Sequence, residues 1–69
     1  MPISLAEAGK EYEISRLGGS SEVRQHLADL GFHVGGKIMI VSKNGKDLIV
    51  NVKGSRVALG RDLVHKVFV

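Results

Sequence analysis

The stretch SSEVRQHLADLGF, residues 20–32, decides the fold, because it predicts the one helix of a chain otherwise typical of β-strands. Val23, Leu27 and Leu30 recur at the spacing of a single apolar helix face. The polar side chains between them are expected to face water: Arg24, Gln25, His26 and Asp29. The stretch therefore predicts a short α-helix over residues 21–30, which has to pack against a sheet to be stable.

Both ends of this helix carry capping signals. Ser20 is a favourable N-cap, since its hydroxyl can accept a hydrogen bond from a backbone N–H of the first turn. Gly31 is expected to end the helix, because glycine adopts the left-handed conformation at little cost. Phe32 is then expected to fold back onto Leu27, as in a Schellman motif.

On either side of the helix, short apolar runs separated by glycines predict strands. The predicted strands are residues 11–17, 37–43, 47–53, 56–59 and 65–69. Asn44-Gly45 is the strongest hairpin signal and predicts a turn in which both residues have positive φ. Gly54-Ser55 predicts a second turn, and residues 60–63 predict one helical turn.

These elements predict one small, mainly β domain that spans residues 1–69. Five short strands and a single helix favour a β-barrel, in which closure removes exposed strand edges. An SH3-like barrel and an OB-like barrel are both compatible with this periodicity.

The charge of the chain is unevenly distributed. Residues 1–35 carry three basic and five acidic groups, a balance of −2, whereas residues 36–69 carry seven basic and two acidic groups, a balance of +5. A basic face could meet nucleic acid, lipid headgroups or an acidic protein, although solvated lysines and arginines on a barrel are the plainer interpretation. There is no cysteine and no apolar run near the roughly 20 residues of a membrane span. The first residues lack a charged lead and a long apolar run, so we expect no signal peptide. We therefore expect a cytoplasmic protein.

One glycine-rich string resembles a phosphate-binding loop without matching it. Residues 31–37 fit the first seven positions of a P-loop, but Ile38 stands where Ser or Thr would hold magnesium. A P-loop also runs from a strand into a helix, whereas here the predicted helix comes first. The string is better interpreted as a turn between helix and strand.

No residue pattern indicates a catalytic or metal centre. His26, His33 and His65 lie at no spacing typical of metal ligation, and cysteine is absent. The serines show no arrangement with His and Asp, and no pair of carboxylates is set up for acid–base chemistry. We expect no enzyme activity, no cofactor and no resident metal. The three aromatic residues, Tyr12, Phe32 and Phe68, are too few to form a stacking surface for single-stranded nucleic acid.

Three segments together resemble the FeoA family. The run LADLGFHVG at residues 27–35 resembles the family's LxxLGxxPG segment, with Val34 in place of its usual proline. The tail VNVKGSRVALGRDL at residues 50–63 looks like the family's "v.v.gsr.aLgr.l" stretch, and SLAEAG at residues 4–9 is similar to its opening. The resemblance covers nearly the whole chain, in order.

This resemblance implies an SH3-like β-barrel with one short α-helix, and a cytoplasmic accessory role in ferrous iron uptake. The implied partner is the membrane protein FeoB, which imports ferrous iron and carries a cytoplasmic GTP-binding domain. Contact with FeoB, rather than catalysis, would then bring the chain to the inner face of the membrane. Two alternatives stay open: an SH3-like regulatory domain of an iron-dependent repressor, and a small barrel that binds nucleic acid.

We place the predicted partner surface around the helix and the loop after it. Loops held by a rigid framework often carry recognition, and arginine and aromatic residues are frequent interface anchors. The candidate residues are Arg24, His26, Phe32 and His33, with Arg56 and Arg61 expected nearby. The plainer interpretation is that Phe32 only packs on Leu27 and that the arginines are solvated.

Overall fold

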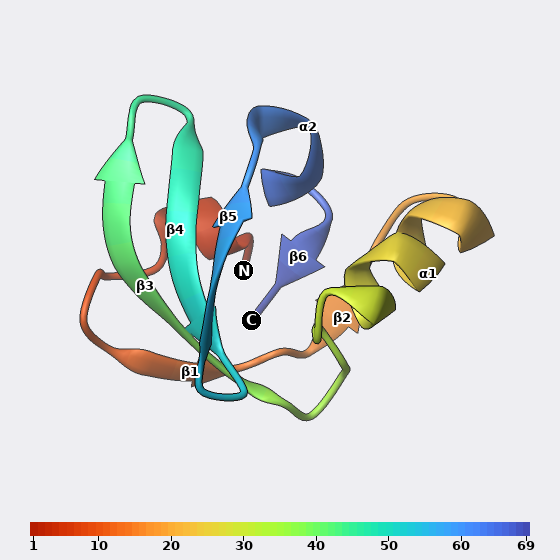
Figure 1. Ribbon diagram of the computed structural model, residues 1–69, viewed down its shortest axis with the longest axis horizontal. Helices are drawn as coiled ribbons and strands as arrows, with labels where there is room; N and C mark the ends of the chain where they lie inside the picture. Colours follow the sequence, from red (N-terminus) through yellow and green to blue (C-terminus); the bar gives the residue numbers. More distant parts are fainter.

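Two antiparallel sheets form the framework of the chain in the computed structural model, which describes residues 1–69 (Figure 1). The main sheet has the strand order β1 (Glu11–Glu13), β3 (Lys37–Asn44), β4 (Asp47–Val52) and β5 (Ser55–Leu59). The second sheet pairs β2 (Arg16–Leu17) with β6 (Val67–Phe68). The helical elements are the 3-10 turn η1 (Ile3–Leu5), the helix α1 (Ser21–Asp29) and the single turn α2 (Arg61–Val64).

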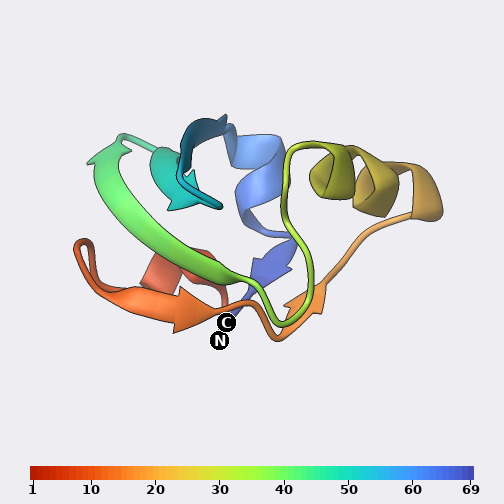
Figure 2. The ribbon, with the colours of Figure 1, turned by 60° about the horizontal axis from the view of Figure 1, so that its bottom comes forward.

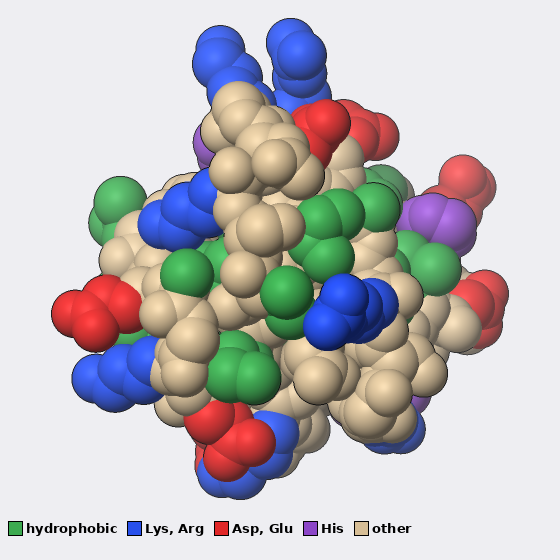
Figure 3. Space-filling model, turned by 60° about the vertical axis from the view of Figure 1, so that its left-hand side comes forward, with side chains coloured by type: hydrophobic (Ala, Val, Ile, Leu, Met, Phe, Trp, Pro, Cys, Tyr) green, Lys and Arg blue, Asp and Glu red, His purple; other side chains and the backbone are tan.

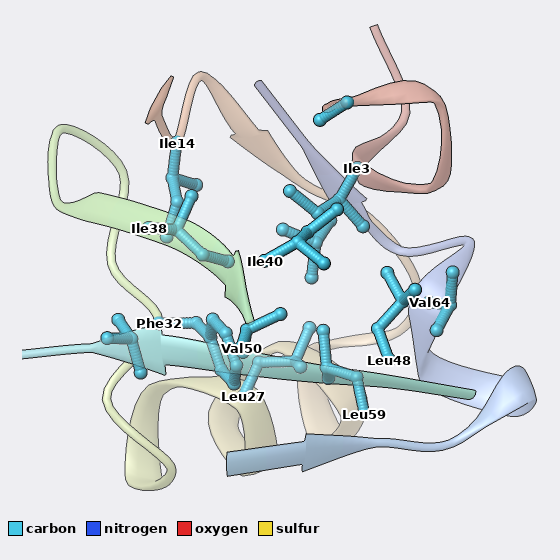
Figure 4. Packing of buried hydrophobic residues seen from close by; sticks show 13 residues of the cluster. Ile3, Ile14, Leu27, Phe32, Ile38, Ile40, Leu48, Val50, Leu59 and Val64 are labelled. Atoms are coloured by element: carbon cyan, nitrogen blue, oxygen red, sulfur yellow. The ribbon is translucent and has the colours of Figure 1, made fainter. Parts of the chain in front are cut away.

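The core lies between these elements and is entirely hydrophobic. In strand β4, Leu48, Val50 and Val52 point into the core, and the residues between them point away from it, as the sequence predicts. The buried residues are Ile3, Ala6, Ile14, Leu27, Phe32, Ile38, Ile40, Leu48, Val50, Val52, Leu59, Val64 and Val67 (Figure 4). No polar side chain is buried, so every polar side chain that could contact a partner lies at or near the surface.

The mainly β class and the single main helix are confirmed, but the sheets do not close into a barrel. Strand β5 is at the end of the main sheet and has a partner strand, β4, on one side only. The expected absence of strand edges is therefore wrong.

The strand predicted over residues 11–17 is broken at Ile14. The Ile14 N–H donates to the Gly36 carbonyl at 2.8 Å, and the Ile14 carbonyl accepts from the Gly35 N–H at 2.8 Å. The next residue, Ser15, donates to the Phe68 carbonyl at 2.8 Å. The chain thus crosses from the main sheet to the second sheet at this point, which explains why Leu17 is out of phase with Tyr12 and Ile14.

The two hairpin turns also differ from the prediction. Asn44 is paired with Asp47 inside the β3–β4 hairpin, so the turn residues are Gly45 and Lys46 rather than Asn44 and Gly45. Only Gly45 has positive φ, at 62°, which is the type II′ pattern. In the β4–β5 hairpin, Val52 pairs with Ser55, and the turn residues Lys53 (φ 51°) and Gly54 (φ 76°) both have positive φ. The predicted type I′ turn exists, but one hairpin later.

The last strand is shorter than predicted, and it lies beside the first residues. His65 caps α2, and only Val67–Phe68 form β6. The Met1 ammonium donates to the Val69 carbonyl at 2.6 Å, and the Val69 N–H donates to the Met1 carbonyl at 2.7 Å. Residues 1 and 69 are therefore neighbours, as Figure 1 shows.

Candidate interaction surface

Helix α1 is held at both ends as the sequence predicts. The Val23 N–H donates to the Ser20 hydroxyl oxygen at 3.2 Å, which satisfies one free donor of the first turn. At the other end Gly31 has φ 105°, the Gly31 N–H donates to the Ala28 carbonyl, and the Phe32 N–H donates to the Leu27 carbonyl at 2.9 Å. These two bonds are those of a Schellman motif.

Two side chains fix α1 and its following loop to the core. Leu27 and Phe32 are both 0% exposed and lie close to Val50 of β4 (Figure 4). Val23 and Leu30, the other members of the predicted stripe, are only partly buried. Phe32 has no accessible surface to offer a partner, so its inclusion among the predicted contact residues is wrong. The plainer interpretation, in which it packs on Leu27, is confirmed.

Arg24, His26 and His33 are exposed at the α1 end of the molecule. At 3.6 residues per turn, Arg24 and His26 point about 160° apart around the helix, on either side of the buried Leu27. The Arg24 Nη1 donates to the Gly19 carbonyl at 3.1 Å, which holds this side chain over the start of the helix. The structure thus keeps these three residues at one end of the molecule without bringing them into a single cluster.

Arg56 and Arg61 lie at opposite ends of β5. Arg56 is near the beginning of β5 and Arg61 follows its end, so a strand rise of about 3.3 Å per residue places them on the order of 15 Å apart. The Arg61 N–H donates to the Asp47 carboxylate at 3.1 Å, beside the β3–β4 hairpin. Figure 2 shows α1 on the other side of the molecule from that hairpin. The expectation that Arg61 lies near α1 is therefore wrong, whereas Arg56 lies at the other end of β5.

The glycine-rich loop between α1 and β3 is a structural turn. It follows a helix and precedes a strand, opposite to a P-loop. The Gly35 N–H donates to the Ile14 carbonyl, and the Gly36 N–H donates to the His33 carbonyl at 2.9 Å. These amides are therefore not free to bind phosphate, as the sequence interpretation predicts.

The remaining polar side chains form no metal cluster and no stacking surface. No group of three or more His, Cys, Asp or Glu side chains is placed to hold a metal ion. The Arg16 guanidinium stacks on the Phe68 ring at 4.0 Å, and the Tyr12 hydroxyl accepts from the Glu7 N–H at 3.0 Å. No helix combines the length and the apolar composition that a bilayer crossing requires.

Two hollows lie at opposite ends of the β3–β4 hairpin. The base hollow, about 220 Å³, is lined by Glu11, Lys37, Ile38, Met39, Asn51, Lys53 and Gly54. The tip hollow, about 290 Å³, is lined by Ser4, Lys43, Gly45, Lys46, Leu48, Val64 and His65. Sequence reasoning missed both. The excess of positive charge after residue 35 was the available signal, but the tip hollow also needs η1 and α2, which are distant in sequence.

The model of the FeoA domain family matches residues 1–69. The chain belongs to the FeoA domain family. "Putative Fe(2+) transport protein A" of Methanocaldococcus jannaschii is 28% identical over 68 residues, which cover 99% of this chain and 83% of that protein. The segments identified in the sequence as FeoA-like therefore indicate the correct family.

Solved structures agree with this assignment. The crystal structure titled "Iron Uptake Regulatory Protein (FeoA)" aligns with a TM-score of 0.87 at 26% identity, covering 97% of this chain and 91% of that one. A manganese-dependent transcriptional repressor aligns with a TM-score of 0.89 over all of this chain and 40% of the repressor, but at 12% identity. The FeoA structure confirms the SH3-like fold, whereas the repressor likeness shows the fold alone.

Proposed function

We propose that this FeoA-family chain assists ferrous iron uptake by binding the cytoplasmic GTP-binding domain of the FeoB transporter. The observation that carries the proposal is the family match over the whole of residues 1–69. The name of the Methanocaldococcus jannaschii relative, Fe(2+) transport protein A, points to the same process. In this proposal ferrous iron is the cargo of the transporter, and the chain acts by contact rather than catalysis.

The α1 end is the surface that we propose for this contact. Arg24, His26 and His33 are exposed, while Leu27 and Phe32 beneath them are fully buried. Polar residues on a rigid base lose little conformational freedom when they bind, because the backbone that carries them is already ordered. In this proposal the transporter domain embraces α1 from both sides, and its hydrogen-bond acceptors contact Arg24 on one side and His26 on the other.

The test is co-purification with the intact transporter in detergent, with and without a GTP analogue. Arg24→Glu and His33→Ala should reduce recovery of the transporter and slow ferrous iron uptake in cells. Both sites are exposed, so the free energy of unfolding should change by less than about 0.5 kcal/mol. Arg61→Glu is the matched control, since it makes the same charge change beside the β3–β4 hairpin, on the other side of the molecule from α1. Unchanged uptake and recovery with Arg24→Glu and His33→Ala would contradict the proposed surface.

No observation favours either alternative function. The likeness to the manganese-dependent repressor, at 12% identity, shows a shared fold and carries no function. For nucleic acid, Phe32 is buried and Phe68 is covered by Arg16, so two of the three rings are engaged within the chain.

A further inference from the structure

The tip hollow is lined by two lysines that have no hydrogen-bond or ion-pair partner. Lys43, Lys46 and His65 surround it, and none of them takes part in a hydrogen bond or an ion pair. No carboxylate lines it. The nearest acidic residue in sequence, Asp47, instead accepts from the Arg61 N–H at 3.1 Å. Figure 3 shows Lys or Arg side chains projecting at the end where the hairpin turns, with Asp or Glu side chains beside their base.

The floor of the tip hollow is apolar. Leu48 is 4% exposed and Val64 is 3% exposed, so both belong to the core and reach the hollow with only a small part of their surface. Leu5, which follows the lining residue Ser4, is 69% exposed. The hollow thus combines an apolar base with a cationic rim.

We propose that the tip hollow binds an acidic segment of a protein partner, with an apolar side chain over Leu48 and Val64 and flanking carboxylates on Lys43 and Lys46. A volume of about 290 Å³ has room for one side chain of moderate size. The lysines supply the point charges that carboxylates favour, and carboxylates on either side of the apolar residue would match the rim.

Other anions fit the hollow less well. A free phosphate would leave the apolar floor unused, and no arginine fork is present to bind it in a bidentate way. A nucleic acid would need stacking rings, and no aromatic residue lines the hollow. An acidic peptide uses both parts of the site.

This inference does not rest on the proposed transporter contact, which uses the opposite end of the molecule. It can therefore be tested on the purified chain alone. The probe is the blocked pentapeptide Glu-Glu-Leu-Glu-Glu, titrated into ¹⁵N-labelled protein while backbone amide resonances are recorded. Saturable shifts are expected at the amides of Ser4, Lys43–Leu48 and Val64–His65, with little change along α1.

Variants then separate the site from general charge attraction. The double variant K43Q/K46Q should weaken peptide binding about tenfold, which is the effect of losing two exposed charge contacts. The matched double variant K37Q/K53Q removes the same charge from the base hollow and should leave the affinity unchanged within about twofold. Equal weakening by both double variants would overturn the proposal.

Altered probes test the two halves of the site. The peptide Gln-Gln-Leu-Gln-Gln should not bind, and Glu-Glu-Ala-Glu-Glu should bind at least about threefold more weakly, because it lacks the apolar contact. Inorganic phosphate that produces the same shifts as the pentapeptide at equal concentration would instead assign the site to a free anion. Binding to phosphatidylglycerol vesicles or to a thymidine oligonucleotide, lost in K43Q/K46Q, with no response to the pentapeptide would also overturn it.

Discussion

The base hollow and the tip hollow share the same two strands and contain two lysines each, yet they differ in chemistry. At the base, Lys37 lies 3.3 Å from the Glu13 carboxylate and Glu11 lines the hollow beside Lys53. At the tip, Lys43 and Lys46 have no acidic neighbour in the lining. The difference comes from β1, which brings glutamates to the base only, because it pairs with the first residues of β3. Which hollow has acidic side chains in or beside its lining is thus decided by strand pairing and not by composition.

The largest effect should come from a cavity in the core, on which the whole comparison depends. Leu27 is fully buried, so Leu27→Ala should lower the free energy of unfolding by about 2–5 kcal/mol. A domain of this size has little stability to lose. Urea unfolding followed by circular dichroism measures the change, with the exposed Leu5→Ala as control. An unchanged midpoint would contradict the core assignment of α1.

A smaller loss of stability should follow from a substitution in the β3–β4 turn, which changes only the tip of the hairpin. Gly45 has φ 62° in a type II′ turn, so Gly45→Ala should cost about 1–3 kcal/mol through backbone strain. An added Cβ would meet nothing within 4 Å, which leaves strain as the only cause. Lys46→Ala, at a neighbouring residue with ordinary φ, should change stability much less. Equal losses from both variants would contradict the turn assignment.

In the turn formed by Lys53 and Gly54, one substitution should raise the stability of the domain instead of lowering it. Lys53 has φ 51°, a conformation that asparagine tolerates better than lysine, so Lys53→Asn should stabilise the domain by about 0.5–1 kcal/mol. Asn44→Lys is the informative partner variant, because Asn44 is a strand residue here and should tolerate the change within about 0.5 kcal/mol. A marked loss with Asn44→Lys would support the turn that the sequence alone predicts.

The smallest expected effect tests the difference in charge between the base hollow and the tip hollow. The Lys37–Glu13 pair is highly exposed, with side-chain exposures of 60% and 62%, so Glu13→Gln should alter stability by less than about 0.5 kcal/mol. The combined variant E11Q/E13Q should release Lys37, remove both acidic side chains from the base, and produce new amide shifts at the base hollow when the acidic pentapeptide is added. If those shifts do not appear, free lysines are insufficient and the apolar floor of the tip is needed as well.

Local signals in the sequence were sufficient for α1 and for the inward face of β4. The cap at Ser20, the stop at Gly31 and the alternation from Leu48 to Val52 each depend on neighbouring residues only, so they can be recognised without the rest of the fold. The family resemblance was equally visible, because it depends on the order and spacing of short motifs.

Features set by long-range pairing could not be predicted. Ile14 leaves its strand because Gly35 and Gly36 take its backbone hydrogen bonds. The turn at Gly45-Lys46 depends on the pairing of Asn44 with Asp47. The pairing register of β3 also shifts between Ile40 and Ser42, and no local sequence pattern indicates this shift. Among the candidate contact residues, Phe32 failed in the same way, because it is a residue type common at interfaces but is buried in the core.

The hydrogen bonds between residues 1 and 69 have a consequence for engineering this fold. Because the two residues are already paired, a short glycine–serine linker could join them, and the chain could be reopened at the turn formed by Lys53 and Gly54. Such a circular permutant would keep α1, the core and the tip hollow while placing its new ends beside the base hollow. It would also allow a label or fusion to be attached far from the tip, which is where a bound acidic segment is expected.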